Sequence, residues 1–175
     1  MKNFKMKLIA VFVLALVPVI GFAQKEFKGI PEDLNQQKII FLNYEPINIS
    51  SEKPKSKEDR YIRDRKEQHN LATEQANDYL RTAALDYPYK YAIANYSSYE
   101  TLVQAGYKYV LQCNCFDNER LMKSPESGVL LIYDFYIKDL TTGDIYILFD
   151  LDEMKVYDYR LVMKKLNKII SKSED

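Results

Sequence analysis

The sequence lacks most of the residues and motifs from which familiar reaction centres are built. It has one histidine, two cysteines and no tryptophan in 175 residues. It contains no Gly-x-Ser-x-Gly, no His-Glu-x-x-His, no phosphate-binding loop and no dinucleotide fingerprint. A zinc site needs about four ligands, and beyond the two thiols the chain offers only His69 and carboxylates. These absences argue against familiar hydrolases and nucleotide enzymes, and we expect neither a metal nor a cofactor.

A long apolar run occurs only near the amino terminus. Three lysines precede the uncharged run 8–22, and the small-x-small pattern Gly21-Phe22-Ala23 follows. The run has about 15 residues, shorter than the roughly 20 that span a bilayer as a helix. This pattern predicts a signal peptide over residues 1–23, cleaved after Ala23. No cysteine lies near that site and no later run is long enough to cross a membrane, so we expect an exported chain without a lipid anchor, either periplasmic or secreted.

The charge left after this cleavage is small. Removal of Lys2, Lys5 and Lys7 changes 25 basic and 25 acidic residues to 22 and 25, a formal charge of 22 minus 25, or −3. Nucleic acid is therefore not an expected partner, because phosphate binding needs a clustered positive surface. We expect residues 24–37 to be an extended lead-in and residues 38–175 to form a single domain.

The remaining pattern predicts a mixed α/β domain. An apolar run without alternation indicates a strand covered on both faces, and a stretch without glycine or proline indicates a long amphipathic helix. Ser97 and Glu100 have the spacing of a capping box, which starts a short helix. The expected strands are 38–44, 90–95, 108–113, 128–138 and 144–149, and the expected helices are 56–87, 97–106 and one that begins between 152 and 158. We therefore expect a single mixed sheet of about five strands, whose last two form a hairpin, with a long, a short and a C-terminal helix packed on it.

Several local strings resemble those of a group of bacterial envelope domains. The strings are KIIFLNYEPINIS, GYKYVLQC and LLIYDFYIKDLTTGDIYI, within roughly residues 38–170. The group includes the curli-secretion lipoprotein, the lipoprotein activators of penicillin-binding proteins and the amino-terminal domain of the Tol-system propeller protein. The resemblance implies a non-enzymatic α/β domain that binds other envelope proteins or assembles into rings, and it implies no catalytic residue.

The two cysteines, Cys113 and Cys115, are spaced as Cys-x-Cys at the end of an expected strand. Residues two apart on a strand lie about 6.5 Å apart, whereas a disulfide needs a Cβ separation of roughly 3.5 to 4.5 Å. A bridge therefore requires the strand to end before Cys115. Structural thiols or a local disulfide are the favoured interpretation, while an intermolecular or redox role stays open and a metal site is the weakest alternative.

Two further sets of ionisable residues have both a structural and a chemical interpretation. His69 lies at helical spacing from apolar residues, and Arg65 and Lys66 beside it supply no nucleophile, so a half-buried structural histidine is favoured over a general base. Asp150, Asp152, Glu153 and Asp158 form the densest acidic cluster. A solvated helix start is favoured over a calcium site, because the stretch lacks the glycine of an EF-hand loop.

Tyrosine is abundant, with 15 residues in the chain. Tyrosine is enriched at protein interfaces, although strands also favour aromatic residues. We take Tyr133, Asp134, Tyr136 and Tyr146 as candidate binding residues, with no catalytic residue. The sequence predicts an exported, non-catalytic envelope protein that binds another envelope protein or itself. The alternative is a periplasmic small-ligand-binding protein or an enzyme that uses Asp134, His69 and the acidic cluster.

Overall fold

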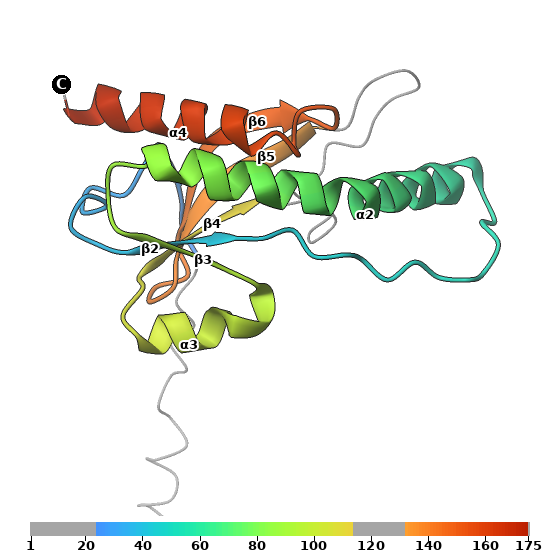
Figure 1. The fold of residues 1–175 in the computed structure, drawn as a ribbon, viewed down its shortest axis with the longest axis horizontal. Helices are drawn as coiled ribbons and strands as arrows, with labels where there is room; N and C mark the ends of the chain where they lie inside the picture. Colours follow the sequence, from blue (N-terminus) through green and yellow to red (C-terminus); the bar gives the residue numbers. More distant parts are fainter. Residues whose placement is uncertain (1–23, 114–131, 175) are drawn as a thin grey trace, which may run out of the picture.

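One six-stranded mixed sheet organises the chain (Figure 1). The computed structural model describes residues 24–113 and 132–174. The strand order is β1-β6-β5-β4-β2-β3, in which β2 is parallel to β3 and β4, β1 is parallel to β6, and β5 is antiparallel to both of its neighbours. The strands are β1 (Glu26–Lys28), β2 (Ile39–Leu42), β3 (Tyr91–Ala94), β4 (Tyr109–Cys113), β5 (Ile132–Asp139) and β6 (Ile145–Asp152). The mixed α/β fold expected from the sequence is confirmed.

Helices lie on both faces of this sheet. Figure 1 shows α2 (Lys57–Ala83) and α4 (Tyr159–Glu174) side by side on one face and α3 (Tyr99–Gln104) on the other. Two 3-10 turns, η1 (Ala84–Asp86) and η2 (Tyr96–Ser98), follow α2 and precede α3. None of the described helices combines the length and the apolar character that a bilayer span requires.

The long helix α2 forms where the sequence predicts it. Ser56 caps its start, because the Ser56 side chain accepts from the Asp59 amide at 2.9 Å and the Asp59 carboxylate accepts from the Ser56 amide at 3.0 Å. This reciprocal pair is a capping box. Ser97 and Glu100 do not form the expected one, because residues 96–98 adopt a 3-10 turn and the N-cap of α3 is Ser98, without a side-chain hydrogen bond. The face of α2 that packs on the sheet carries His69, Thr73, Ala76, Leu80 and Ala83.

Strand β2 is covered on both faces, as its uninterrupted apolar run predicts. Ile39, Ile40 and Phe41 are all 0% exposed. Ile39 and Phe41 belong to the main core beneath α2 and α4. Ile40 packs with Ala94 and Val110 in a smaller core on the α3 side. The strand therefore joins the two hydrophobic layers of the domain.

The lead-in over residues 24–37 contains a strand that the sequence does not reveal. Residues 26–28 read Glu-Phe-Lys and are exposed, so no apolar run or alternation marks them. They nevertheless pair in parallel with β6, from Glu26 opposite Ile145 to Lys28 opposite Ile147. The sheet consequently has six strands instead of about five. The backbone ladder supplies this pairing, because an edge strand needs no buried side chain.

The hairpin between β5 and β6 turns through residues 139–144, as the sequence predicts. The buried carboxylate of Asp139 accepts from the Thr141 amide at 2.7 Å and from the Thr142 amide at 3.2 Å. Gly143 has φ +80°, a conformation that glycine adopts without steric cost. Along β5, the side chains of Tyr133, Phe135 and Ile137 point into the main core.

The acidic cluster before α4 is not a single solvated helix start, which corrects the interpretation from the sequence. Asp150 and Asp152 lie within β6. The Glu153 side chain is 8% exposed and pairs with Arg65 of α2 at 3.1 Å. Only Asp158 stands at the start of the helix, where its side chain accepts from the Arg160 amide at 3.1 Å. Strand β6 ends later than expected and includes Asp150 and Asp152. The sequence assigned these acidic residues to a helix start because acidic residues are common there.

Candidate functional site

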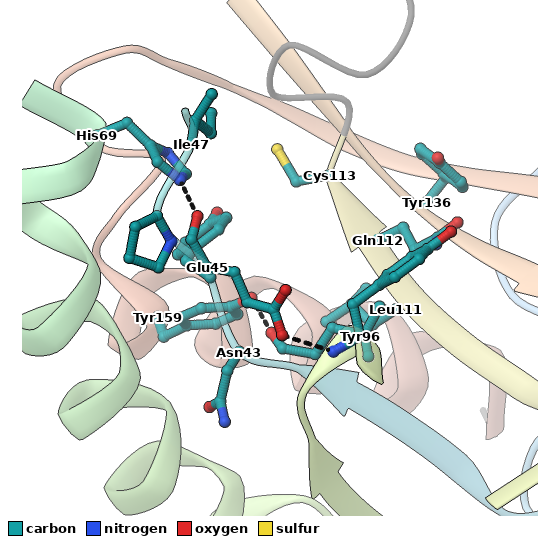
Figure 2. Close-up of a pocket in the computed structure, with 13 residues that line it drawn as sticks. Asn43, Glu45, Ile47, His69, Tyr96, Leu111, Gln112, Cys113, Tyr136 and Tyr159 are labelled. Carbon is teal, nitrogen blue, oxygen red and sulfur yellow. Dashed lines mark hydrogen bonds between the residues drawn. The ribbon is translucent and has the colours of Figure 1, made fainter. Parts of the chain in front are cut away.

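A cavity lies at the carboxyl ends of the parallel strands β2 and β4 (Figure 2). The chain leaves β2 towards α2 on one face of the sheet and leaves β3 towards α3 on the other (Figure 1). Ligands of open α/β sheets bind in the crevice at such a switch point. The cavity has a volume of about 600 Å³, within the range of roughly 300 to 1,000 Å³ for small-molecule sites. Its described lining residues are Leu42, Asn43, Tyr44, Glu45, Pro46, Ile47, His69, Tyr96, Leu111, Gln112, Cys113, Tyr136 and Tyr159.

One wall of this cavity is the extended segment 43–47, which two asparagines of α2 hold in place. Asn77 accepts from the Tyr44 amide at 2.8 Å and donates to the Tyr44 carbonyl at 3.0 Å. Asn70 does the same for Ile47, at 2.7 and 2.9 Å. Each amide side chain thus pairs with a backbone N–H and C=O as a neighbouring strand would. The segment leaves the sheet at Leu42 but keeps its backbone hydrogen bonds.

His69 fixes the same segment between these two asparagines. It is 3% exposed, and its Nε2 lies 3.0 Å from the Glu45 carbonyl oxygen while its Nδ1 lies 3.2 Å from the Tyr157 hydroxyl. Because a carbonyl only accepts, Nε2 carries a proton and donates it, and in the neutral tautomer Nδ1 accepts from the Tyr157 hydroxyl. Both ring nitrogens are therefore engaged in hydrogen bonds. This geometry supports a structural histidine, more deeply buried than the sequence predicts.

Tyrosines pack around His69, and two of their hydroxyls are directed to backbone carbonyls. Tyr44 donates to the Val156 carbonyl at 2.9 Å, and Tyr159 donates to the Leu42 carbonyl at 2.9 Å. The Tyr44 ring lies 5.2 to 5.5 Å, centroid to centroid, from the rings of His69, Tyr157 and Tyr159. This side of the cavity is a rigid aromatic wall whose donors are already used.

The mouth of the cavity is more exposed than the aromatic wall and contains the charged side chain of Glu45. The Glu45 carboxylate is exposed and accepts from the Tyr96 amide at 2.9 Å. Tyr96 is 64% exposed and its ring stacks on Tyr99 with a centroid separation of 5.9 Å. Figure 2 shows the Tyr96 side chain extending across the cavity towards Gln112 and Tyr136. With His69 neutral, Glu45 is the charged side chain among the described lining residues.

The structure does not bring the four candidate binding residues together. Tyr136 lines the cavity, and Asp134 lies on the same face of β5, opposite Asp150 of β6. Tyr133 is 1% exposed on the other face of β5, in the main core. Tyr146 is half-buried on that core side, where it stacks on Phe27 at 5.0 Å. The alternation of a strand separates neighbours in sequence onto opposite faces, so the tyrosine-rich hairpin does not present one surface.

The two cysteines are described only in part. Cys113 is half-buried at the end of β4 and lines the cavity. Cys115 lies outside the described residues, so the disulfide, thiol and redox interpretations stay predictions. Within residues 24–113 and 132–174, no three histidine, cysteine, aspartate or glutamate side chains are grouped so that they could hold a metal ion.

A second charged cluster lies at the opposite end of β4 and attaches the lead-in to the sheet. Lys108 pairs with Asp33 at 2.8 Å and lies 3.6 Å from Asp139, and the Tyr109 hydroxyl donates to Asp33. Burial alone would raise the pKa of the Asp33 carboxyl, but hydrogen bonds from Lys108 and Tyr109 and the charge of Lys108 lower it on balance. The same hydrogen bond to Asp33 raises the pKa of the Lys108 ammonium. Every member of this cluster has a structural partner.

We expect Asp33→Asn to destabilise the protein by about 1 kcal/mol at pH 7, since the ion pair is partly exposed. The pKa of Asp33 is lower in the folded chain than its ordinary value of 3.8, so its contribution is complete above about pH 4 and is lost as the pH falls through the folded pKa. The stability difference between the two proteins should therefore shrink from pH 7 to pH 3, as measured by urea unfolding. A difference that stays constant with pH would contradict this assignment, and Asp64→Asn, on the exposed face of α2, is the matched control.

The residues that form the cavity come from segments far apart in the chain. The sequence predicts the strands that end there, but it does not single out Glu45, Tyr96, Asn70 or Asn77. The spacing of seven between Asn70 and Asn77 is the one signal, because residues two helical turns apart lie on one face.

Comparisons with protein-family models, with curated proteins and with solved structures find no match for this chain. Its cavity, its exposed carboxylate and its sheet edges are the features that bear on function.

Proposed function

We propose that this chain is an exported, non-catalytic module of the bacterial envelope that binds an extended segment of another protein along the outer edge of β3. The observation that carries the proposal is the nature of this edge. Strand β3 is the last strand of the sheet and reads Tyr-Ala-Ile-Ala, without charge, proline or glycine. Such an edge is a template for an added strand.

The direction of the backbone groups of β3 follows from its pairing with β2. The carbonyls of Lys90 and Ala94 accept from the amides of Ile39 and Asn43, at 3.1 and 2.9 Å. Because successive residues of a strand point their backbone groups to opposite sides, Tyr91 and Ile93 direct theirs outwards. No residue in the described ranges pairs with this outer side in the sheet order. The backbone groups of Tyr91 and Ile93 can thus form hydrogen bonds with an added strand.

The other edge of the sheet is similarly short but carries charged side chains, which protect against strand addition. Strand β1 has three residues, all exposed, and two of them are Glu26 and Lys28. Short length and charged side chains are the usual means by which proteins prevent edge pairing. The contrast between the edges favours β3 as the docking site.

The arrangement of ionisable groups supports a binding role over catalysis. His69 lines the cavity, whereas Asp150 and Asp152 line a separate hollow with Lys155 and Lys165. Asp134 is not among the described residues that line either space. The enzyme alternative required these side chains to converge. Their separation weighs against it, and the ring nitrogens of His69 are both occupied by structural hydrogen bonds.

The compartment and the type of partner in this proposal come from the sequence. The predicted signal peptide over residues 1–23 lies outside the described residues. The resemblance to the envelope domains supports a protein partner, either another envelope protein or a second copy of the chain. We propose a different protein as the partner, and the mass of the chain at high concentration distinguishes it from a second copy.

Capture from envelope extract by the wild-type exported chain and three variants tests this role. Ile93→Pro removes an outward N–H and should abolish capture, while leaving the β2 ladder, which uses the alternate residues. Ile93→Ala removes the side chain but keeps the N–H, so it should retain the proteins bound by the wild type. Lys28→Pro, on the outer edge of β1, should also retain them.

One result would count against docking at β3, and a second would keep the docking edge but change its partner to another copy of the chain. One is capture of the same proteins by Ile93→Pro as by Ile93→Ala, with both variants shown to be folded by circular dichroism. The other is self-association in place of partner binding, which light scattering at high concentration would reveal as a dimer mass that Ile93→Pro lowers to a monomer mass.

A further inference from the structure

We infer that the cavity between segment 43–47 and strand β4 takes an arginine side chain from the protein partner. This inference rests on the proposed binding role and adds the chemistry of the group that is recognised. It depends on Glu45 and the tyrosines at the cavity mouth, and it does not depend on the outer edge of β3.

The charge of the cavity selects a cation. Glu45 is the one formally charged side chain among its described lining residues when His69 is neutral. Among the described residues, its carboxylate accepts one hydrogen bond, of 2.9 Å from the Tyr96 amide, which leaves lone pairs that a further donor can reach. No described lysine or arginine forms an ion pair with it. An anionic ligand would meet a carboxylate that no described basic side chain compensates.

The hydrogen-bond inventory of the walls points the same way. The Tyr44 and Tyr159 hydroxyls donate to backbone carbonyls, and the His69 Nε2 proton is donated to the Glu45 carbonyl. Besides the Asn43 and Gln112 amides, which can donate and accept, the described lining offers the Glu45 carboxylate and the Tyr96 ring, with Tyr136 beside it (Figure 2). The carboxylate and the ring both attract positive charge. A donor-rich cation therefore matches the site better than an acceptor.

The chain already binds its own arginines with this combination of groups. Arg160 lies 3.9 Å over the Tyr79 ring and pairs with Asp158 at 2.8 Å. Arg65 lies 5.5 Å from the Tyr61 ring centroid and pairs with Glu153 at 3.1 Å. In each case a guanidinium contacts one tyrosine ring and one carboxylate. At the cavity mouth, the Glu45 carboxylate contacts the Tyr96 backbone amide and the Tyr96 ring also borders the cavity, so a carboxylate and a tyrosine ring are again present, without a described arginine between them.

Guanidinium is favoured over ammonium for a physical reason. Its planar fork can stack on a tyrosine face and donate to a carboxylate at the same time, and it is less strongly hydrated than an ammonium group. The cavity volume of about 600 Å³ also leaves room for residues that flank the arginine in a peptide.

Titration of the exported full chain with two small probes, followed by amide NMR shifts, tests the inference. N-acetyl-arginine amide carries the guanidinium, and N-acetyl-citrulline amide is its neutral isostere. We expect the arginine probe to bind at least about tenfold more tightly and to shift the Tyr96 amide, because the charge accounts for the recognition. Equal affinity for the two probes, or shifts confined to another surface, would overturn the inference.

A pair of variants locates the charge. Glu45→Gln keeps an acceptor for the Tyr96 amide but removes the negative charge, so the arginine probe should lose at least about fivefold in affinity and approach the citrulline value. Glu100→Gln removes the same charge from the exposed face of α3, close to Tyr96 in sequence, and should leave the affinity unchanged. An equal loss in both variants would mean a general field effect and would overturn the site.

The outcomes also separate this inference from the proposed function. Arginine-probe binding that survives in Ile93→Pro, together with unchanged partner capture by that variant, would reject docking at β3 and keep the cavity assignment. Loss of partner capture in Ile93→Pro, together with equal probe affinities, would reject the cavity assignment and keep the docking edge.

Discussion

Phe41→Ala is expected to lower the free energy of unfolding by about 3 to 5 kcal/mol, the usual cost of deleting a buried aromatic ring. Phe41 is 0% exposed in the middle of β2. Its ring makes an edge contact with Tyr87 at 5.0 Å and a tilted contact with Tyr91 at 5.4 Å, between centroids. The ring therefore joins β2, β3 and the turn after α2, and alanine would leave a cavity that three separate elements would have to close.

Urea unfolding followed by circular dichroism measures this loss, with Phe27→Ala as the matched control. Phe27 also stacks on a tyrosine, Tyr146 at 5.0 Å, but it is 41% exposed on the edge strand β1. The control should cost less than about 1 kcal/mol. Similar losses for the two variants would show that β2 does not carry the core. A large effect of Phe41→Ala on partner capture alone, without loss of stability, would also contradict its placement.

The part of the fold that could be predicted is the part that buries continuous apolar segments. Strand β2 has an apolar run without alternation, and the structure buries it on both faces. Helix α2 has an uninterrupted stretch without glycine or proline, and it runs for 27 residues. In both cases the spacing of apolar residues along the sequence matches the spacing of the side chains that the structure buries. The sequence therefore predicts these elements.

The elements that could not be predicted are those whose stability comes from the backbone. Strand β1 forms through its ladder with β6, and its three residues are all exposed. The Ser97 and Glu100 capping box is absent because the chain enters α3 through the 3-10 turn at 96–98. Many four-residue segments have the residue types of a capping box. The backbone conformation just before the helix decides whether the two hydrogen bonds form. The box at Ser56 and Asp59 is such a match that does form.

The candidate site could not be predicted from the sequence for a different reason. The cavity lies where the ends of β2 and β4 meet the start of η2, and residues such as Glu45 and Tyr96 are 51 positions apart. A single carboxylate after a strand has no distinctive pattern. The tyrosine-rich hairpin has a strong pattern, but the pleat of β5 directs Tyr133 and Tyr136 to opposite faces. The tyrosine content therefore indicated the hairpin as a binding site. The cavity instead forms where the connections after β2 and β3 leave the sheet towards opposite faces.

Asn77→Ala and Asn70→Ala are each expected to cost about 2 to 3 kcal/mol, because each variant leaves a backbone N–H and C=O of segment 43–47 without their partner. Asn77 holds Tyr44 and Asn70 holds Ile47, each through two hydrogen bonds of 2.7 to 3.0 Å. Leu71→Ala is the control on the same helix, since Leu71 is 84% exposed, and it should change stability by no more than about 0.5 kcal/mol.

The two asparagine variants also control for each other when amide hydrogen exchange is measured. In Asn77→Ala the Tyr44 amide should exchange faster while the Ile47 amide stays protected, and Asn70→Ala should show the reverse, because each amide donates to a different asparagine. Equal acceleration at both positions would mean that the segment opens as one unit. Acceleration at neither position would mean that the strand-like hydrogen bonds from α2 do not hold this wall. Since Glu45 lies between the two anchored residues, the crossed pattern would show that α2 fixes the position of the carboxylate proposed to bind arginine.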